Sequence, residues 1–248
     1  MKLHSAEVID RQRHGDHVRL RCGWPGEAPE AGQFVMVREE GDSLDPFLSR
    51  PFFAHDYEEG VIDLLIVVRG RGTAILSTAP ELRISDPIGH GFGCPANGPV
   101  ALIGGGVWVS PLRLLSRRLE SQNIAHDIYL EVPADSSNDY REFLLERFPQ
   151  AILVDTGGGR NAAHDLVLEV GDLSRYETLY VSGEPETLFA AKTAAAGIVS
   201  AQLAVRERMA CANGSCFGCA VPVRKSARTE FVRACVEGPV FEAAELAW

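Results

Sequence analysis

Four cysteines near the end of the chain are the residues whose type and spacing most directly suggest chemistry. Cys211, Cys216 and Cys219 have the spacing C-x4-C-x2-C, and Cys235 follows further along the chain. The first three match the spacing of plant-type [2Fe–2S] sites, in which each of two irons takes two thiolates. Small residues between them, such as Gly214, allow the backbone to curl closely around a cluster, because no large Cβ intervenes.

Two other readings of these cysteines stay open at this point. A structural zinc site usually uses two C-x2-C pairs, and only Cys216 and Cys219 form such a pair here. Free thiols are the second alternative, although buried thiols rarely cluster so densely. Cys22 and Cys94 are isolated in the sequence, and we expect each to be a small buried hydrophobe.

Two segments in the first third of the chain have residues suited to a phosphate or a flavin. Residues 48–53 read LSRPFF, in which the rigid Pro51 follows Arg50, whose guanidinium can meet a phosphate or a ring. Residues 65–73 read LIVVRGRGT, a strand that runs into glycines before Thr73 opens a short helix. Free N–H groups at a helix start bind anions. The local pattern slightly favours an ordinary glycine turn capped by Thr73.

The elements that must position these residues follow two patterns. In residues 1–98, short β-branched or alternating runs separated by turns predict an antiparallel barrel or sandwich. These runs are residues 7–9, 17–22, 33–38, 61–68 and 81–84. In residues 99–205, strands alternate with helices, which predicts parallel βαβ units. The predicted strands are residues 100–103, 127–132, 151–155 and 178–182, and the helices are residues 111–122, 139–148 and 186–196.

Composition and charge exclude several classes of protein. The chain has 248 residues, 46% of them hydrophobic, which suits a globular protein of at least two domains. A net charge of -10 is opposite in sign to that of most nucleic-acid or anionic-membrane binders. The sequence has neither an apolar run long enough to span a bilayer nor a signal-peptide core. We therefore expect a cytoplasmic protein that binds neither nucleic acid nor membrane.

The segments and their order resemble one family, the electron-transfer subunits of class B dihydroorotate dehydrogenase, within the ferredoxin–NADP reductase-like superfamily. Residues 207–223, ERMACANGSCFGCAVPV, and residues 233–241, RACVEGPVF, are the most specific parts. The resemblance implies an FAD-binding β-barrel in residues 1–98 and an NAD(P)-binding-like α/β domain in residues 99–205. It also implies a [2Fe–2S] domain in residues 206–248.

The resemblance further implies a task and a partner. Electrons would pass from NAD(P)H through FAD and the cluster to a catalytic, FMN-containing dehydrogenase subunit of pyrimidine biosynthesis, in a hetero-oligomer. The cluster loop, residues 212–217, should then lie near the partner surface. His55 lies close after the LSRPFF segment, and we expect it at the protein surface.

The resemblance also assigns cofactor contacts residue by residue. The implied FAD contacts are Arg50, Pro51, Phe52 and Phe53 of an Arg-Pro-x-Ser motif, Leu65, Ile66 and Val67 of a strand, and Gly72 and Thr73 at the phosphate. Phe53 stands where that motif has serine. The dinucleotide turn matches Gly104, Gly105 and Gly106, and the cluster ligands match Cys211, Cys216, Cys219 and Cys235.

The nicotinamide region departs from the family pattern at two positions. Trp108 stands where the turn Gly-Gly-Gly-x-Gly has its fourth glycine, and Ser182 replaces a cysteine that usually lies near the flavin. Because that glycine lets the dinucleotide approach the backbone, we expect the indole to fill part of the nicotinamide pocket. The alternative function is therefore a divergent electron-transfer or regulatory subunit that does not itself oxidise NAD(P)H.

Overall fold

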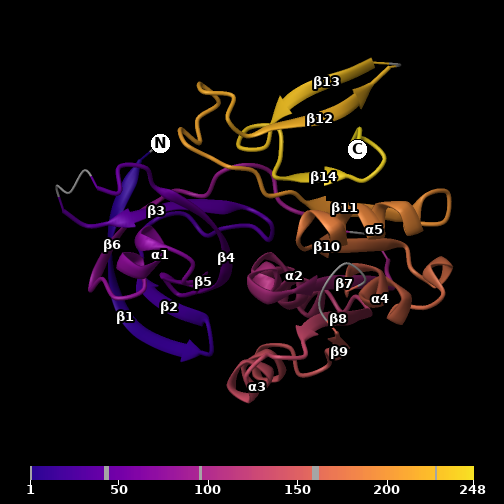
Figure 1. The fold of residues 1–248 in the computed structure, drawn as a ribbon, viewed down its shortest axis with the longest axis horizontal. Coiled ribbons are helices and arrows are strands. Elements are labelled where there is room, and N and C mark those ends of the chain that lie inside the picture. The colour runs from indigo at the N-terminus through magenta and orange to yellow at the C-terminus, as the bar shows by residue number, and fades with distance from the viewer. Residues whose placement is uncertain (1, 42–44, 95–96, 158–161, 227) are drawn as a thin grey trace.

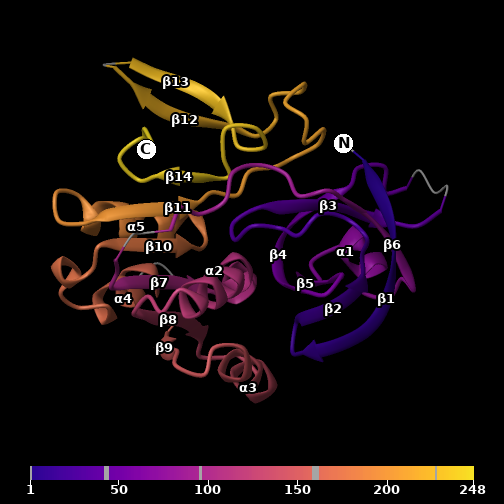
Figure 2. The ribbon, with the colours of Figure 1, turned by 180° about the vertical axis from the view of Figure 1, so that it is seen from behind.

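The computed structural model describes residues 2–41, 45–94, 97–157, 162–226 and 228–248. Within these residues, a closed antiparallel barrel and a six-stranded, mainly parallel sheet lie side by side, as Figures 1 and 2 show from opposite directions. A two-stranded ribbon lies beyond one edge of the sheet. This arrangement confirms the predicted fold class of an N-terminal β-barrel followed by an α/β domain and a small C-terminal region.

The barrel closes in the order β1-β2-β5-β4-β3-β6. Its strands are β1 (Leu3–His14), β2 (His17–Gly23), β3 (Phe34–Glu39), β4 (Arg50–Glu58), β5 (Val61–Val67) and β6 (Glu81–Ser85), and the short helix α1 (Arg71–Leu76) follows β5. Because side chains alternate along a strand, β5 sends Ile62, Leu64 and Ile66 into the barrel core. Leu65 points outward, into the core of the α/β domain.

The second sheet has the order β14-β11-β10-β7-β8-β9, and only β14 is antiparallel to its neighbour. Its strands are β7 (Val100–Gly105), β8 (His126–Pro133), β9 (Ile152–Thr156), β10 (Thr178–Ser182), β11 (Ser200–Ala204) and β14 (Val240–Glu242). The helices are α2 (Ser110–Ser121), α3 (Asn138–Arg147), α4 (Ala162–Glu169) and α5 (Pro185–Ala195), with 3-10 turns η1 (Gly106–Val109) and η2 (Leu173–Arg175).

Each face of this sheet carries its own hydrophobic core. Leu112 and Leu115 of α2 pack with Phe143 of α3 on one face, and Leu166 of α4 packs with Leu188 of α5 on the other. Helices on both faces are what right-handed βαβ crossovers produce in a parallel sheet. The buried face of α2, with Leu112, Leu115 and Leu119, has the spacing of an apolar helix stripe.

Strands that the sequence pattern did not reveal complete both sheets. The barrel strand β4 begins at Arg50 and Pro51, and a proline inside a run normally counts against a strand. In the C-terminal region, β12 (Ala220–Lys225) and β13 (Arg228–Arg233) form the separate ribbon. The three-residue β14 then returns to pair with β11, so the chain after the cysteine loop is joined to the α/β sheet.

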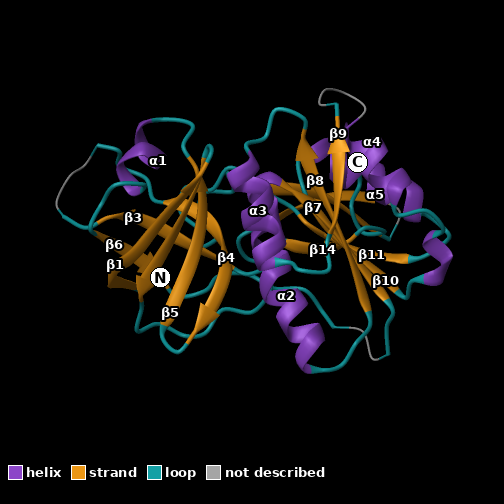
Figure 3. Cartoon of the chain, turned by 90° about the horizontal axis from the view of Figure 1, so that it is seen from below, coloured by secondary structure: helices purple, strands orange, loops and turns teal. Residues whose placement is uncertain are grey.

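Helices α2 and α3 lie between the barrel and the sheet, which Figure 3 shows from below. On the barrel side, His14 stacks on Phe143 with ring centroids 4.5 Å apart, and His17 stacks on Tyr140 at 4.1 Å. His55 is fully buried behind Phe143, so the expectation that it lies at the surface was wrong. His55 is buried because α3 packs over it, and the sequence around residue 55 gives no sign of that long-range contact.

Among the described residues, no helix combines the length and the apolar character needed to cross a bilayer.

Candidate functional site

The C-terminal cysteines lie in a loop that precedes β12, except for Cys235, which follows β13. Cys211 lies beside Cys216, and Cys235 lies beside Cys219. The N–H of Cys216 points at the Cys211 sulfur at 3.4 Å, and the N–H of Gly218 points at the Cys216 sulfur at the same distance. The four cysteines therefore lie as two neighbouring pairs, and N–H donors are directed at the sulfurs of Cys211 and Cys216.

Three residues of this loop have left-handed backbone conformations, which most residue types other than glycine rarely adopt. Ala212, Gly214 and Phe217 all have positive φ angles, of 50°, 83° and 56°. A Cβ on Gly214 would meet the Val236 side chain at 2.9 Å, so this position requires glycine for both shape and space. Phe217 remains 50% exposed. The tip of the loop thus faces solvent, as a surface for a partner would.

These residues fit a binuclear cluster better than a single zinc ion. Each iron of a [2Fe–2S] cluster takes two thiolates, which matches the two observed pairs. A structural zinc site usually uses two C-x2-C pairs, whereas Cys211 is separated from Cys216 by four residues. Hydrogen bonds from the N–H groups of Asn213 and Cys216 lower the pKa of the Cys211 thiol to about 6, which favours the thiolate that a metal requires.

A mainly apolar pocket, called here the central pocket, lies where the barrel, the α/β domain and the cysteine segment meet. The barrel contributes aromatic and aliphatic side chains to it, η1 and α2 close one wall, and the segment before the cysteine loop closes another. The lining residues are Phe34, Pro51, Phe52, Phe53, Leu65, Val67, Arg69, Thr73, Val107, Trp108, Ser110, Val205, Arg206, Glu207 and Met209. Such a pocket suits a flat aromatic ring system with few polar atoms.

Beside the central pocket, Arg50 of β4 lies across the start of α1. A Cβ on Gly72 would come within 2.4 Å of the Arg50 guanidinium, so the absent side chain is what leaves room for it. The Thr73 hydroxyl accepts hydrogen bonds from the N–H groups of Arg69 at 3.0 Å and Gly70 at 3.2 Å. Thr73 therefore shapes the turn locally, while Arg50 places a guanidinium beside it, a group whose geometry matches that of a phosphate.

The glycine-rich turn after β7 places Trp108, rather than the glycines, at the pocket. Gly104 and Gly105 are enclosed by protein, since a Cβ there would meet Leu112 at 2.7 Å and Glu131 at 2.6 Å respectively. Gly106 has a φ of +54° and turns the chain into η1. The three glycines thus fix the path of the backbone and do not line the central pocket.

Trp108 forms a wall between two cavities. It lines the central pocket and also a larger open cleft, the outer cleft, formed with the start of α5 and the chain end near Trp248. Only 6% of Trp108 is exposed, and the Arg206 guanidinium lies over its ring, 5.0 Å from the centroid. Five other residues also line both cavities: Pro51, Val205, Arg206, Glu207 and Met209. The indole therefore forms part of the boundary between a nicotinamide that would lie in the outer cleft and a ring that would lie in the central pocket.

Ser182 lies at the end of β10, close to Gly104, and is completely buried. Its hydroxyl oxygen has no hydrogen-bond partner among the described residues. A buried hydroxyl without a partner is costly, typically by about 1–3 kcal/mol. Both residues that depart from the family pattern are thus buried beside the same turn.

Six of the twelve predicted FAD and dinucleotide contacts line the central pocket, and the other six do not: Arg50, Ile66, Gly72, Gly104, Gly105 and Gly106. Pro51, Phe52 and Phe53 line the central pocket, and so do Leu65 and Val67 from the neighbouring strand. Ile66 points the opposite way, into the barrel core, because strand side chains alternate. Only its backbone can face a ligand on that side.

Nine lining residues were not among the predicted contacts: Phe34, Arg69, Val107, Trp108, Ser110, Val205, Arg206, Glu207 and Met209. Glu207 and Met209 lie in the segment 207–223, directly before the cysteine loop, and that segment is the sequence signal that could have found them. Burial raises the pKa of the Glu207 carboxyl, which places a group that readily holds a proton at the pocket.

Comparisons with known proteins agree with this geometry. Residues 206–247 match the model of the iron-sulfur cluster binding domain of dihydroorotate dehydrogenase B. An NADH-dependent reduced ferredoxin-NADP oxidoreductase structure superposes with a TM-score of 0.76 at 22% identity, over 98% of this chain and 90% of that chain. Phthalate dioxygenase reductase superposes with a TM-score of 0.63 at 14% identity, over 94% of each chain. These structures share the fold.

Relatives in sequence have higher identity and cover most of the chain. The electron transfer subunit of dihydroorotate dehydrogenase B (NAD(+)) from Caldanaerobacter subterraneus subsp. tengcongensis is 32% identical over 250 residues, with 97% of each chain covered. The subunit of the same name from Desulforamulus reducens is 32% identical, over 88% of this chain and 86% of its own. The chain therefore belongs to the family of electron transfer subunits of dihydroorotate dehydrogenase B.

Proposed function

We propose that this chain carries electrons from NAD(P)H, through FAD and a [2Fe–2S] cluster, to a partner dehydrogenase that oxidises dihydroorotate. One observation carries the proposal: the segment that closes the central pocket continues directly into the cysteine loop. Met209 lines the pocket, and the first cysteine, Cys211, comes two residues later. A flavin ring in the pocket and a cluster in the loop would therefore be neighbours with little protein between them.

The chain's own residues would hold each cofactor and keep water away from it. When bound, FAD accepts a hydride and releases electrons singly, and the cluster carries one electron at a time. Phe52, Phe53 and Leu65 would enclose the flavin ring, and Arg50 at Gly72 would pair with its phosphate.

The remaining site residues are assigned by the same proposal. Pro51 and Val67 would complete the ring pocket, Ile66 would contribute through its backbone, and Thr73 would shape the phosphate turn. The cluster ligands would be Cys211, Cys216, Cys219 and Cys235, and the dinucleotide turn would be Gly104, Gly105 and Gly106. We likewise propose residues 1–98, 99–205 and 206–248 as the FAD, nucleotide and cluster domains.

The partner would dock over the exposed cluster loop. Phe217 projects from the loop with half of its surface exposed, beside the exposed thiol of Cys216. A catalytic subunit carrying FMN would receive electrons there, which makes the active assembly a hetero-oligomer of the cytoplasm.

A second function rests on the Trp108 wall. With the indole between the two cavities, the chain would take electrons from a donor other than NAD(P)H, or would regulate its partner. The two functions differ in whether Trp108 and Arg206 would move aside to let a nicotinamide reach the flavin. Hydride transfer needs direct contact between the two rings.

An anaerobic absorption spectrum before and after NADH addition tests the proposal. Flavin and iron–sulfur bands that bleach together on addition of NADH support the complete electron path. Bands that bleach with dithionite but not with NADH support the second function. Absence of iron and acid-labile sulfide from protein purified without oxygen would refute the cluster assignment.

A further inference from the structure

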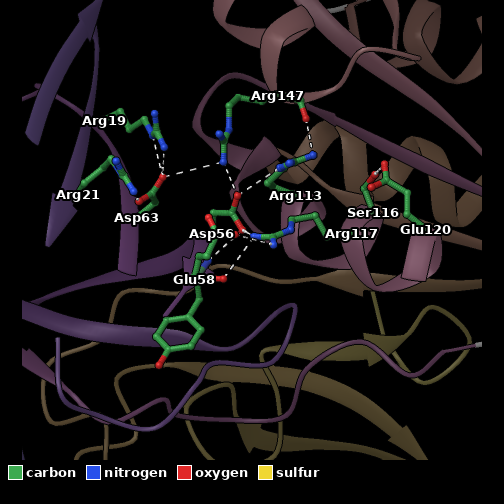
Figure 4. Close-up of polar contacts among 11 residues, drawn as sticks. Arg19, Arg21, Asp56, Glu58, Asp63, Arg113, Ser116, Arg117, Glu120 and Arg147 are labelled. Carbon is green, nitrogen blue, oxygen red and sulfur yellow. Dashed lines mark hydrogen bonds and ion pairs between the residues drawn. The ribbon is translucent and has the colours of Figure 1, made fainter. Parts of the chain in front are cut away.

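A second polar cavity, the arginine pocket, lies between the barrel and helices α2 and α3, and Figure 4 shows its charged residues. It has a volume of about 350 Å³ and shares no lining residue with the central pocket or the outer cleft. Arg19 and Arg21 reach it from β2, Arg113 and Arg117 from α2, and Arg147 from the end of α3. Five guanidinium groups from three elements thus converge on one space.

The carboxylates of the pocket do not balance these charges. Asp56, Glu58 and Asp63 also line it, which leaves two positive charges in excess, in a chain whose net charge is -10. The Arg117 guanidinium donates to Asp56 at 2.6 Å, and Arg147 also donates to Asp56. A network that only fastened the barrel to the helices would need no surplus of charge around an open volume.

The arginines of the pocket are not fully paired by the fold. The Nε of Arg147 has no hydrogen-bond partner among the described residues, although it is buried away from the open volume. Arg21 approaches Asp63 only through its Nε, at 3.4 Å, and its two terminal nitrogens make no hydrogen bond with any part of the chain described. Burial and the nearby charge of Arg19 lower the pKa of Arg147, as expected for a guanidinium without full compensation.

We propose that the arginine pocket binds a small phosphorylated metabolite through its phosphate group. Guanidinium forks match the geometry of phosphate oxygens. A phosphate monoester carries roughly -1.5 to -2 charges at pH 7, which balances the excess of two. The volume lies within the range of small-molecule sites, about 300–1,000 Å³, so it holds an organic part besides the phosphate.

The ligand would touch the barrel and both helices at once. It would therefore bind the docked arrangement of the two domains and stabilise the folded protein as its concentration rises. Because α2 starts directly after η1, which contains Trp108, the ligand would also hold the helix that carries the wall of the central pocket.

The test uses the FAD- and cluster-loaded protein with glycerol 3-phosphate as the probe and thermal unfolding as the readout, at constant ionic strength. A saturable rise in Tm is expected for the wild type. Arg21→Gln should weaken the apparent affinity at least tenfold, because it removes a donor that the fold does not use. Its Tm without ligand should stay near that of the wild type, since Asp63 keeps its hydrogen bonds from Arg19.

Arg13→Gln is the matched control, because it removes the same charge from the exposed surface of the adjacent strand. It should leave the affinity unchanged. If glycerol 3-phosphate does not raise the Tm of the wild type, the proposal is overturned. The same holds if it raises the Tm of Arg21→Gln and Arg13→Gln equally. Malonate serves as a dicarboxylate arm, and a response equal to that of glycerol 3-phosphate would overturn the assignment to phosphate.

Discussion

The contact between Arg50 and Gly72 allows the proposed FAD phosphate site to be tested with one methyl group. In a Gly72→Ala variant, the new Cβ would stand 2.4 Å from the Arg50 guanidinium, far inside van der Waals contact. The guanidinium is the end of a flexible side chain, so it would move aside instead of unfolding the turn. We therefore expect the variant to fold and to lose the position of one positive charge.

The magnitude follows from the interaction that is lost. A hydrogen bond to a charged group contributes about 1.5–3 kcal/mol, which corresponds to FAD binding weakened roughly 10- to 150-fold. The stability of the folded protein should increase, because alanine in a helix is about 0.5–1 kcal/mol more favourable than glycine. FAD affinity and the stability of the cofactor-free protein should thus change in opposite directions.

Fluorescence titration of the cofactor-free protein with FAD measures the first quantity, and urea unfolding measures the second. Gly70→Ala is the control, because no atom lies within 4 Å of the Cβ that it would add. The double variant with Arg50→Gln should bind FAD no more weakly than Arg50→Gln alone, since both changes remove one contact. Unchanged FAD affinity in Gly72→Ala, or full additivity in the double variant, would refute the role given to Arg50.

Three further predictions concern the rest of the site and the domain interface. Trp108→Gly should speed the reduction of bound flavin by NADH in anaerobic stopped-flow, at a cost of about 3–5 kcal/mol in stability; an unchanged rate would contradict the blocking role. Cys219→Ser should remove the iron–sulfur absorption and keep the flavin bands, whereas Cys94→Ser should keep both. Burial lowers the pKa of His17 to about 4 in the folded protein, whereas its pKa in the unfolded chain is about 6.5. As the pH falls, the unfolded chain therefore takes up the proton first. The free energy of unfolding should decrease as the pH drops from 6.5 to 4. Between pH 7.5 and 5.5, the loss in the free energy of unfolding due to His17 is about 1.4 kcal/mol, measured by urea unfolding. A His17→Phe variant whose free energy of unfolding falls by the same amount as that of the wild type over this range would contradict the prediction.

Prediction from sequence succeeded where neighbours in the chain are neighbours in space. The strand β5 and the stripe Leu112, Leu115 and Leu119 of α2 were predictable, because both depend on the types of residues that are close together in the chain. The strand β4 was missed because Pro51 stands near its start, and a proline is tolerated there only in particular positions of a sheet. The burial of His55 was missed because the covering side chain, Phe143, lies far away in the sequence.

The sequence by itself predicted the ligand set of the cluster, and it determined the two-part fold and the family, since all three depend on residue types at fixed spacings. Only the tertiary structure decided that Arg50 lies over Gly72, that Trp108 separates two cavities, and that five arginines from three elements surround one polar space. The physical reason is that such contacts depend on strand order and on how α2 and α3 dock against the barrel. How the helices dock depends on which complete faces of helices and sheets are buried against one another. The spacing of residues within one segment does not determine this.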